Sequence, residues 1–566
     1  MRAGLIPVFF ELQPDPKNPN LARAGGRAYS FDFSDAGAPT ALGELGCMRF
    51  PKSHTTLRTY VDTIFKGEYK YGREVDNQWP SFRDPLLYDG TEDIPQSDWK
   101  VVYDTVLYAR GISDRTTYRI NKGTTFSQLP EPIQDVSTAF AEFLFNQTNG
   151  VLTDLVKAYA DNDPDAIHKI WQELNDTYQD KSIFEVLRDQ GWEDVIKGTN
   201  NTSRLSIFGT LGLGSGGFDA FWGTTFMEIL RIKIHEDEVN QDAFVGGSSY
   251  MLSPFLTHKT LCADGQTKSL QEVTNTHVIP IPVKRIIPAF DGVNIYVEGS
   301  ETPYVFPCVV LTASPTAISS SIVFDESIFN ADTWNGIRNI PLTGCGKTFL
   351  AFPKAFWKGE EESGRDSIVT TVTDQAIRQV YTFDDYHWGS GSEMGVLMLS
   401  YTWGDWAHKM GSLEGEEQVQ STLRMLKDIY HAKGERQWPF STWYPAIESA
   451  ILNGKFYAIN WSHERGFAGG YRMADLNRYS DQVHMAVSGV LPNRPDAAVF
   501  LAGEAIAWLG LSGWIEGALH TGINSTLGVG SWFDISANAF NNWGKVVDPS
   551  KISGTSFAAI PSPVAE

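Results

Sequence analysis

The chain has 566 residues, of which 42% are hydrophobic and 20% charged, a composition typical of a folded protein with two or three domains. Its formal net charge of −22 at pH 7, without a basic stripe, excludes nucleic acid and anionic membrane as expected partners. Four cysteines lie far apart with no CxxC pair, which favours free thiols over a disulfide framework.

The first predicted elements are a strand over 5–10 and a glycine turn. The strand ends on Glu11, and Gly25, Gly26 and Arg27 follow fourteen residues later. A carboxylate in this position suits the hydroxyls of an adenosine ribose, and the glycines let the backbone pass close to a pyrophosphate that Arg27 can neutralise. The stretch is typical of the second strand of a dinucleotide-binding unit, and a hairpin without a binding role is the alternative.

The remaining predicted elements change in type along the chain. Helices are predicted up to about residue 240, in "PIQDVSTAFAEFLFNQ", "VLTDLVKAYA" and "DPDAIHKIWQELNDTY". Short strands follow from about 270 to 315, and a mixed region to about 480 contains "KTFLAF" and "EMGVLMLSYTW". The segments "DAAVFLAGE" and "GWIEGALHTGINS" predict a buried strand, a glycine turn and a helix. An apolar run here has nearly the length of a membrane span, but it contains Glu504 and four glycines and is predicted to be core.

A literal GxGxxG motif occurs at Gly212, Gly214 and Gly217. In a dinucleotide site this motif closes a strand and opens a helix, and a second strand ending in an acid follows. Here a helix is predicted over 218–234, but the polar "HEDEVNQDAF" stands where the second strand is required. We therefore interpret the motif as a glycine-rich turn at which the backbone approaches another element.

Six segments in order carry a resemblance to a known family: "AGGRAYS", "GELGCMRFP", "FGTLGLGSGGF", "GCGKTF", "LSYTW" and "FLAGE…GWIEGAL…NS". Together they resemble the flavin-containing amine oxidase superfamily, in particular its L-amino-acid oxidase and tryptophan 2-monooxygenase branch. The resemblance implies an α/β plus α+β fold. Its expected units are a discontinuous, Rossmann-like FAD-binding domain (1–60, 241–340 and 481–545), a mixed-sheet substrate-binding domain (61–115 and 341–480) and a helical domain (116–240).

The resemblance assigns most of the motif residues to FAD. Glu11 and Arg27 are expected at the adenosine and pyrophosphate, and Glu504 at the ribityl chain. The segment "GCMR" is expected beside the flavin, with Cys47 where the family commonly has Ala. The whole expected cofactor set is Glu11, Gly25, Gly26, Arg27, Gly46, Met48, Arg49, Val283, Glu504, Trp514 and Ile515.

A second expected set contacts the substrate. Arg49 resembles the arginine that clamps the substrate α-carboxylate, a task suited to a planar bidentate donor, and Tyr401 would donate its hydroxyl to the same group. Trp461 is expected as an aromatic wall of the side-chain site, with plain core as the alternative. Gly513 and Trp514 are expected against the flavin and substrate.

The resemblance assigns one further residue to catalysis. Lys347, in "GKTF", resembles the lysine that holds a water against flavin N5. No motif places a Ser/His/Asp set, a metal-ligand cluster or paired acids. The redox step is therefore expected from the flavin, with orientation and electrostatics from the protein.

The implied activity is oxidation of an L-amino acid by hydride transfer from Cα to the flavin and reoxidation by O2, giving a 2-oxo acid, ammonia and hydrogen peroxide. An L-amino acid 2-monooxygenase, which gives an amide and CO2, is the alternative within the family. A flavin-free binding or structural protein is the alternative outside it. Phe221 and Trp222 favour an aromatic or large apolar substrate, whereas Asp219 keeps a basic substrate open.

The sequence departs from the family pattern at its start. The family's first strand and GxGxxG loop, which place backbone N–H groups at the pyrophosphate, do not precede Leu5. Three explanations stay open: the segment lies on a separate chain, the chain is truncated, or the protein binds no flavin. A homodimer or larger oligomer is expected. A cytoplasmic location is favoured, and secretion stays open because the start of the chain is incomplete by the family pattern.

Overall fold

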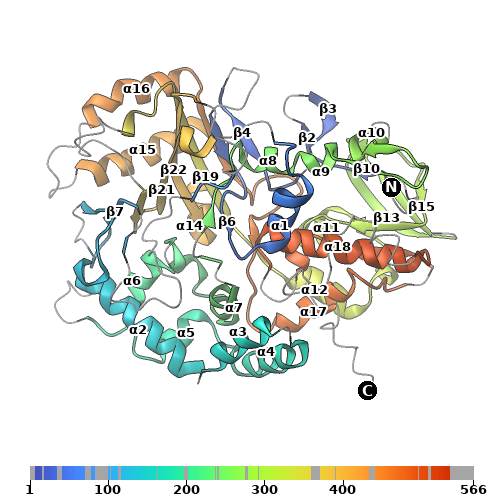
Figure 1. Cartoon of the computed structure of the whole chain (residues 1–566), viewed down its shortest axis with the longest axis horizontal. Coiled ribbons are helices and arrows are strands. Elements are labelled where there is room, and N and C mark those ends of the chain that lie inside the picture. The colour runs from blue at the N-terminus through green and yellow to red at the C-terminus, as the bar shows by residue number, and fades with distance from the viewer. Residues whose placement is uncertain are drawn as a thin grey trace.

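A seven-stranded mixed sheet forms the centre of one half of the molecule (Figure 1). The neighbouring strands pair antiparallel except β20 and β7, which pair in parallel. In spatial order the strands are β23 (Phe456–Asn460), β19 (Cys345–Phe352), β22 (Gly395–Trp403), β21 (Gln379–Phe383), β20 (Thr370–Thr373), β7 (Thr105–Tyr108) and β8 (Tyr118–Ile120). The computed structural model describes residues 5, 7–15, 18–23, 25–34, 41–69, 78–82, 100–101, 103–112, 117–148, 150–161, 163–196, 202–213, 215–235, 237–238, 241–274, 278–290, 292–358, 370–388, 391–431, 440–494, 496–507 and 511–535.

The two central strands, β19 and β22, are buried along their whole length. Both faces of the sheet are covered, so these strands need apolar side chains on both sides. On one face Leu350 and Leu397 pack with α15 (Gly415–His431) and α16 (Phe440–Leu452), which Figure 1 shows together over the sheet. On the other face Phe349 and Met398 join the largest core of the protein.

A group of helices lies beyond that second face (Figure 1). They are α2 (Glu131–Thr148), α3 (Val151–Ala160), α4 (Pro164–Tyr178), α5 (Ile183–Arg188), α6 (Arg204–Leu211) and α7 (Met227–His235). α4 begins where the sequence predicts, because Asp163 accepts the N–H of Ala166 at 3.0 Å and Pro164 occupies the first turn. The three predicted amphipathic helices are confirmed.

The helix predicted over 218–234 is wrong in extent. The structure has a 3-10 turn, η4 (Phe218–Phe221), and then the separate helix α7. Between them the N–H groups of Thr225 and Phe226 donate to the carbonyls of Ala474 and Lys181, which are distant in sequence. These backbone bonds to neighbouring segments replace the bonds of a continuous helix.

The other half of the molecule contains smaller sheets. A four-stranded sheet has the order β15 (Tyr304–Phe306), β14 (Gly292–Val297), β13 (Val283–Ala289) and β17 (Val323–Phe324). Two pairs of parallel strands pack near it without joining its ladder: β1 (Phe9–Phe10) with β12 (Val278–Ile279), and β16 (Cys308–Leu311) with β25 (Ala498–Leu501). No described strand joins the two pairs. The long helix α18 (Ile515–Trp532) crosses this half (Figure 1).

The predicted strand over 5–10 is confirmed only at Phe9–Phe10, since the described residues before it form no ladder. The predicted order of strand, glycine turn and helix near the end is confirmed by β25 and α18. Packed around β16 and β25 are α11 (Pro315–Ser321), α12 (Ala331–Asn339) and α17 (Tyr479–Val487), whose apolar residues form a core of their own.

Shorter elements connect these units. They are β2 (Pro14–Asp15), β3 (Asn18–Ala22), β4 (Ser30–Asp32), β5 (Leu42–Glu44), β6 (Phe50–Pro51), α1 (Thr55–Thr59), η1 (Tyr60–Ile64), η3 (Phe126–Gln128), β9 (Gln241–Asp242), α8 (Gly247–Leu252), α9 (Pro254–Thr257), β10 (Lys259–Leu261), β11 (Thr267–Ser269), α10 (Leu270–Thr274), η5 (Glu326–Ile328), β18 (Leu342–Thr343), η6 (Phe356–Lys358), α13 (Asp385–Trp388), α14 (Gly404–Gly411), β24 (Tyr471–Arg472) and η7 (Glu504–Ile506). The predicted domain boundaries stay a prediction. The structure places β8 in the seven-stranded sheet, although the sequence assigns residues 118–120 to the helical unit.

The GxGxxG segment forms a turn after α6, as interpreted from the sequence. Gly212 and Gly217 have positive φ values of 62° and 70°. A Cβ on Gly217 would lie 2.9 Å from the Gln379 amide nitrogen and 3.3 Å from the Trp403 ring. The glycine therefore lets the backbone approach the seven-stranded sheet. Gly214 lies outside the described residues.

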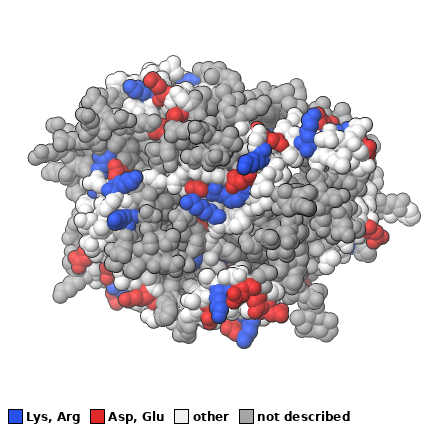
Figure 2. All heavy atoms as spheres, viewed as in Figure 1, with Lys and Arg blue, Asp and Glu red and all other residues white. Residues whose placement is uncertain are grey.

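Three bulk properties follow from the structure. All four cysteines are free thiols, as the sequence favours. Figure 2 shows described Lys and Arg side chains interspersed with Asp and Glu on one face. Among the described helices, none combines the length and the apolar character needed to cross a membrane.

Candidate active site

A cavity of about 1670 Å³ lies between the two parallel strand pairs, α18 and the seven-stranded sheet. Drug-sized ligands fill about 300–1,000 Å³, so this cavity has room for a dinucleotide together with a small substrate. Every residue that the sequence assigns to cofactor or substrate contact lines it, whereas Lys347 does not. The assigned lining residues are Glu11, Gly25, Gly26, Arg27, Gly46, Met48, Arg49, Val283, Tyr401, Trp461, Glu504, Gly513, Trp514 and Ile515.

At one end of the cavity a carboxylate follows β1. Glu11 accepts the N–H of Gln13 at 2.9 Å, and burial raises the pKa of Glu11. The turn after it has positive φ values at Gly25 and Gly26, of 98° and 57°. A side chain on Gly46 would overlap the carbonyl oxygen of Arg27, so glycine is required for the two backbones to pass each other.

Arg27 and Glu504 form an ion pair inside the cavity. Arg27 Nη2 lies 2.8 Å from Glu504 Oε1, and the other carboxylate oxygen accepts the N–H of Gly513 at 2.7 Å. Arg27 Nη1 also donates to the carbonyl of Gly469 at 3.2 Å. This network holds the glycine turn, the loop after β25 and the start of α18 together.

Arg49 lies deeper in the cavity and is 6% exposed. Its Nη1 lies 3.4 Å from Glu238 Oε2, and Glu238 also lines the cavity. Burial raises the pKa of Tyr401, and the nearby Arg49 guanidinium opposes that rise. The Tyr401 hydroxyl therefore stays protonated and can donate a hydrogen bond at neutral pH.

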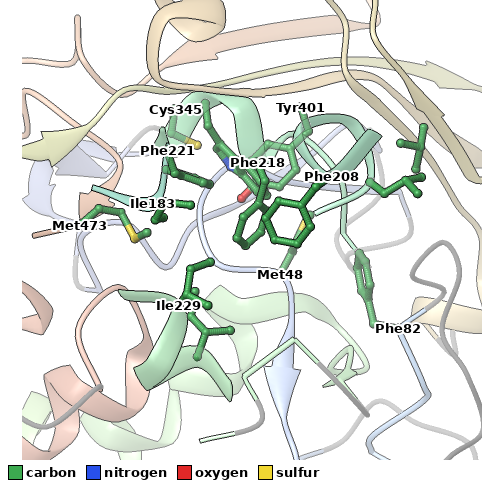
Figure 3. Packing of buried hydrophobic residues seen from close by; sticks show 14 of the residues in the cluster. Met48, Phe82, Ile183, Phe208, Phe218, Phe221, Ile229, Cys345, Tyr401 and Met473 are labelled. Atoms are coloured by element: carbon green, nitrogen blue, oxygen red, sulfur yellow. The ribbon is translucent and has the colours of Figure 1, made fainter. Parts of the chain in front are cut away.

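Four aromatic rings line the same cavity as this charged pair, and we call Phe221, Tyr401, Trp403 and Tyr471 the aromatic box. The ring centroids of Tyr401 and Trp403 are 5.0 Å apart, and those of Phe221 and Trp403 are 5.2 Å apart. Tyr471 is 6.5 Å from both Phe221 and Trp403. Figure 3 shows Phe221 and Tyr401 grouped with Phe218 and Cys345 below the sheet. Flat apolar walls of this kind suit an aromatic side chain.

Trp461 belongs both to the core and to the cavity wall. It is 2% exposed, its Nε1 donates to the carbonyl of Leu45 at 2.8 Å, and its ring lies edge-on to Phe467 at 5.0 Å. The two alternatives weighed from the sequence are therefore not exclusive.

Lys347 sits behind the segment that carries Arg49. In the β19–β22 register it faces Tyr401, but its Nζ donates to the carbonyls of Glu44 and Gly46 at 2.9 and 2.5 Å. Met48 Sδ lies 3.4 Å from the same nitrogen. Burial lowers the pKa of Lys347 to about 8. In this structure the lysine supports the wall of the cavity from outside.

Asp219 is held away from the cavity. Its carboxylate forms an ion pair with Arg378 and accepts the Trp406 Nε1–H at 3.1 Å. Asp219 is not among the cavity-lining residues. The expectation that it keeps a basic substrate open loses its support, because the carboxylate already has a cationic partner.

Several cavity residues were missed by the sequence reasoning, namely Arg231, Glu238, Trp403 and Tyr471. Arg231 forms ion pairs with Glu228 and, at 3.3 Å, with Asp237. Trp403 had a signal, because it follows Tyr401 by two residues on one strand and therefore shares its face. Glu238 lies in a polar loop after α7, where nothing in the local pattern distinguishes it from a solvated acid.

The start of α18 rests on a buried polar cluster. Glu516 accepts the N–H groups of Thr56 and Leu57, both at 2.8 Å, and lies 3.2 Å from His520 Nε2. His54 lies edge-on to Trp514 at 5.3 Å. Trp514 directly precedes α18, so the hydrogen bonds that hold Glu516 in the first turn of this helix also hold Trp514 at the cavity.

A family model described as flavin containing amine oxidoreductase matches residues 22–526, so the chain belongs to the flavin-containing amine oxidoreductase family. It is 26% identical over 533 residues to a tryptophan 2-monooxygenase of Pantoea agglomerans pv. gypsophilae, covering 90% of this chain and 82% of that protein. It is also 26% identical over 520 residues to the tryptophan 2-monooxygenase of Allorhizobium ampelinum, of which it spans 63%. A solved putrescine oxidase variant has a TM-score of 0.59 at 15% identity, covering 95% of this chain and 94% of that one.

These findings establish the class. The fold is that of the FAD-binding amine oxidases, and the chain is a flavin-dependent enzyme that acts on an amine or amino acid with O2 as oxidant. The cofactor of the family is FAD. The resemblance inferred from the six sequence segments is confirmed, and so are the predictions of enzyme activity and of FAD.

The residues present fit FAD. A carboxylate after β1, a turn of two glycines with positive φ and the Arg27 side chain line one end of the cavity. Gly522, on the face of α18 that lines the cavity, has no atom within 4 Å of where its Cβ would lie. Glycine at these positions leaves room that a bound dinucleotide can occupy.

Proposed function

We propose that this enzyme oxidises an L-amino acid with an aromatic side chain. The observation that carries the proposal is the Arg49–Glu238 pair beside the aromatic box within one cavity. A planar guanidinium suits a carboxylate, the Tyr401 hydroxyl adds a donor, and the rings offer apolar surface to the side chain. Among the described residues, the acid near the box is Glu238, which pairs with Arg49 at the α-carboxylate end of the proposed site.

The site residues have distinct proposed roles. Arg49 and Tyr401 hold the α-carboxylate, and Trp461 and Trp514 limit the space around the substrate and exclude water. Glu11, Arg27 and Glu504, with the glycine turn, hold FAD. The chemistry that FAD supplies when bound is acceptance of a hydride from the substrate Cα and transfer of electrons to O2. Lys347 supports the Gly46–Arg49 segment, and its expected role, to hold a water at the flavin, stays part of the proposal.

We further propose that the product is an amide, as in a 2-monooxygenase reaction. An amino acid and O2 then give the amide with one fewer carbon, CO2 and water. The oxidase reaction, which gives a 2-oxo acid, ammonia and hydrogen peroxide, is the first expectation from the sequence, in which no residue decides between the two reactions. The names of the relatives at 26% identity support the monooxygenase instead.

Product analysis separates these reactions. The FAD-loaded enzyme is incubated in air with L-tryptophan and with L-phenylalanine, and amide, 2-oxo acid and peroxide are quantified. Amide without peroxide supports the proposal. A 2-oxo acid with stoichiometric peroxide would identify an oxidase, and turnover of basic amino acids alone would contradict the assignment to aromatic substrates.

The two separate parallel strand pairs, β1 with β12 and β16 with β25, support a further part of the proposal. A parallel strand between β1 and β16, ending in a glycine-rich turn, would join the two strand pairs and add N–H groups for the pyrophosphate. We propose that such a strand, on a separate chain, completes the FAD site. Titration of the purified chain with FAD tests this, since tight stoichiometric binding by the residues seen here would show that no added strand is needed.

A further inference from the structure

Two adjacent carboxylates follow α7 and have different surroundings. Asp237 is fully buried, lies 3.3 Å from Arg231 Nη1 and lies 3.4 Å from His54 Nε2. Its neighbour Glu238 has a 12% exposed side chain that lines the cavity beside Arg49. The buried contacts of Asp237 fix the backbone, so Glu238 is presented to the cavity from a held position.

Glu238 is the cavity-lining acid that lies beside Arg49, the proposed binding residue for the substrate carboxylate. Among the described residues, three carboxylates line the cavity: Glu11, Glu238 and Glu504. Glu11 lies after β1 and bonds to the backbone, and Glu504 is engaged by Arg27 and Gly513. Glu238 is the one that contacts Arg49, and its charge acts on both Tyr401 and Tyr471 of the aromatic box.

The Glu238 carboxylate beside Arg49 is unfavourable if the ligand is a simple carboxylic acid. It competes for the same guanidinium and repels the incoming anion. The arrangement becomes favourable for a zwitterion, whose ammonium and carboxylate groups are separated by two bonds through Cα. A cation and an anion 3.4 Å apart in the wall then face the opposite charges of the ligand. A guanidinium has five N–H donors and can bond both carboxylates at once.

Two other charged side chains close to this pair in the chain or in the cavity wall, Arg231 and Asp237, have local partners. Arg231 has Glu228 and Asp237, and Asp237 also faces His54. Burial raises the pKa of both Tyr401 and Tyr471, which keeps these hydroxyls neutral. Without Glu238, a buried ammonium group of the substrate would lose its carboxylate counter-charge in an apolar cavity, which is costly.

We infer that Glu238 is a specificity-determining residue that binds the substrate's α-ammonium group, so that Arg49 and Glu238 together select an amino acid over a simple amine or a carboxylic acid. This inference rests on the proposed function. It assigns to Glu238 a role separate from carboxylate binding by Arg49 and from side-chain recognition by the aromatic box.

Three ligands of one shape test the inference. L-Tryptophan has both charges, tryptamine lacks the carboxylate, and indole-3-propionate lacks the amine. Their affinities are measured anaerobically by calorimetry on the FAD-loaded enzyme after the flavin has been reduced with dithionite, so that L-tryptophan binds without being oxidised. The proteins are the wild type, Glu238→Gln, Glu238→Asp and the control Glu173→Gln. Glu173 is 56% exposed on α4, is not among the residues that line the cavity, and contacts Lys169.

Glu238→Gln should weaken L-tryptophan binding roughly 10–100-fold, as expected for loss of a charge-assisted hydrogen bond. It should leave indole-3-propionate unchanged or bound more tightly, because a competing carboxylate is removed from Arg49. Glu238→Asp, which keeps the carboxylate, should recover part of the L-tryptophan affinity, and Glu173→Gln should match the wild type.

Equal weakening of L-tryptophan and indole-3-propionate by Glu238→Gln would overturn the inference, since it would mean that Glu238 only positions Arg49. Unchanged L-tryptophan affinity would overturn it as well. If Glu238→Gln does not fold, Glu238→Asp decides. Its shorter carboxylate should lower the affinity for L-tryptophan relative to that for indole-3-propionate, and an unchanged ratio of these two affinities would overturn the inference. A wild type that binds aromatic amines but no amino acid would instead overturn the proposed function.

Discussion

The guanidinium of Arg27 contacts the carboxylate of Glu504 at 2.8 Å, although the two residues are 477 positions apart. The pair connects the glycine turn after β1 with the loop after β25. Gly513 donates to the same carboxylate, so the start of α18 depends on it as well. The ion pair therefore connects three segments that are distant in the chain, and all three line the cavity.

Breaking this pair from either side should destabilise the protein. Arg27→Ala or Glu504→Ala should each cost about 3 kcal/mol, because each leaves a mostly buried charge without its partner. The double variant should cost less than the sum of the two by at least about 1 kcal/mol. Urea unfolding of the four proteins measures this coupling, and strictly additive costs would show that the ion pair contributes nothing.

Arg49 should tolerate lysine poorly. Arg49→Lys keeps the positive charge but loses the planar fork, and we expect the KM for an aromatic L-amino acid to rise about 10-fold. Arg49→Ala should raise it further. Arg188→Lys is the matched control, since Arg188 is 45% exposed on α5 and pairs with Asp189. Steady-state kinetics on the FAD-loaded variants checks this, and an unchanged KM in Arg49→Lys would argue against carboxylate binding by Arg49.

Lys347 gives stability a defined pH dependence. Burial lowers its pKa from 10.5 to about 8, so between these values the unfolded chain binds more protons than the folded one. The cost of burying the charge is present in full below pH 8 and is relieved as pH rises toward 10.5. The wild type should therefore gain about 2 kcal/mol over Lys347→Met between pH 7 and pH 9.5. Chemical unfolding at both pH values measures this, and a constant difference would mean that Lys347 keeps its ordinary pKa.

Glu516 should show the opposite dependence at acid pH. Burial by itself would raise its pKa, but the His520 hydrogen bond, the nearby His54 and the N–H of Leu57 lower it to about 2. A depressed carboxylate pKa stabilises the fold above pH 4.5, and this contribution is lost as pH falls toward 2. Glu516→Gln should cost about 3 kcal/mol at pH 7 and about 1 kcal/mol at pH 3. Equal costs at the two pH values would contradict the assigned ionisation.

The resemblance of six segments to a known family allowed the class of fold, the cofactor and most of the residues that line the cavity to be predicted, because such segments are short local patterns. Gly25, Gly26 and Arg27 follow a strand that ends in an acid, and Trp514 stands at the start of a helix after a glycine turn. Turns and helix starts of this kind depend on the residue types at adjacent positions, so they can be predicted from a short stretch of sequence.

The parts that could not be predicted depend on partners distant in the chain. Asp219 looked available for a basic substrate, but Arg378 neutralises it from 159 positions away. The hydrogen bonds of Lys347 to the carbonyls of Glu44 and Gly46 could not be read from its strand, and its catalytic role stays a prediction. Glu238 gave no signal at all, since its role depends on Arg49, 189 positions away.

The proposed activity is the oxidation of aromatic L-amino acids with FAD bound in this cavity. It is tested most directly by following the visible flavin spectrum of the FAD-loaded protein under anaerobic conditions while L-tryptophan is added, with D-tryptophan and tryptamine as controls. We predict that L-tryptophan bleaches the spectrum in stoichiometric amounts and that neither control does so at the same concentration. A spectrum that aromatic L-amino acids leave unchanged, while FAD stays bound, would contradict the account.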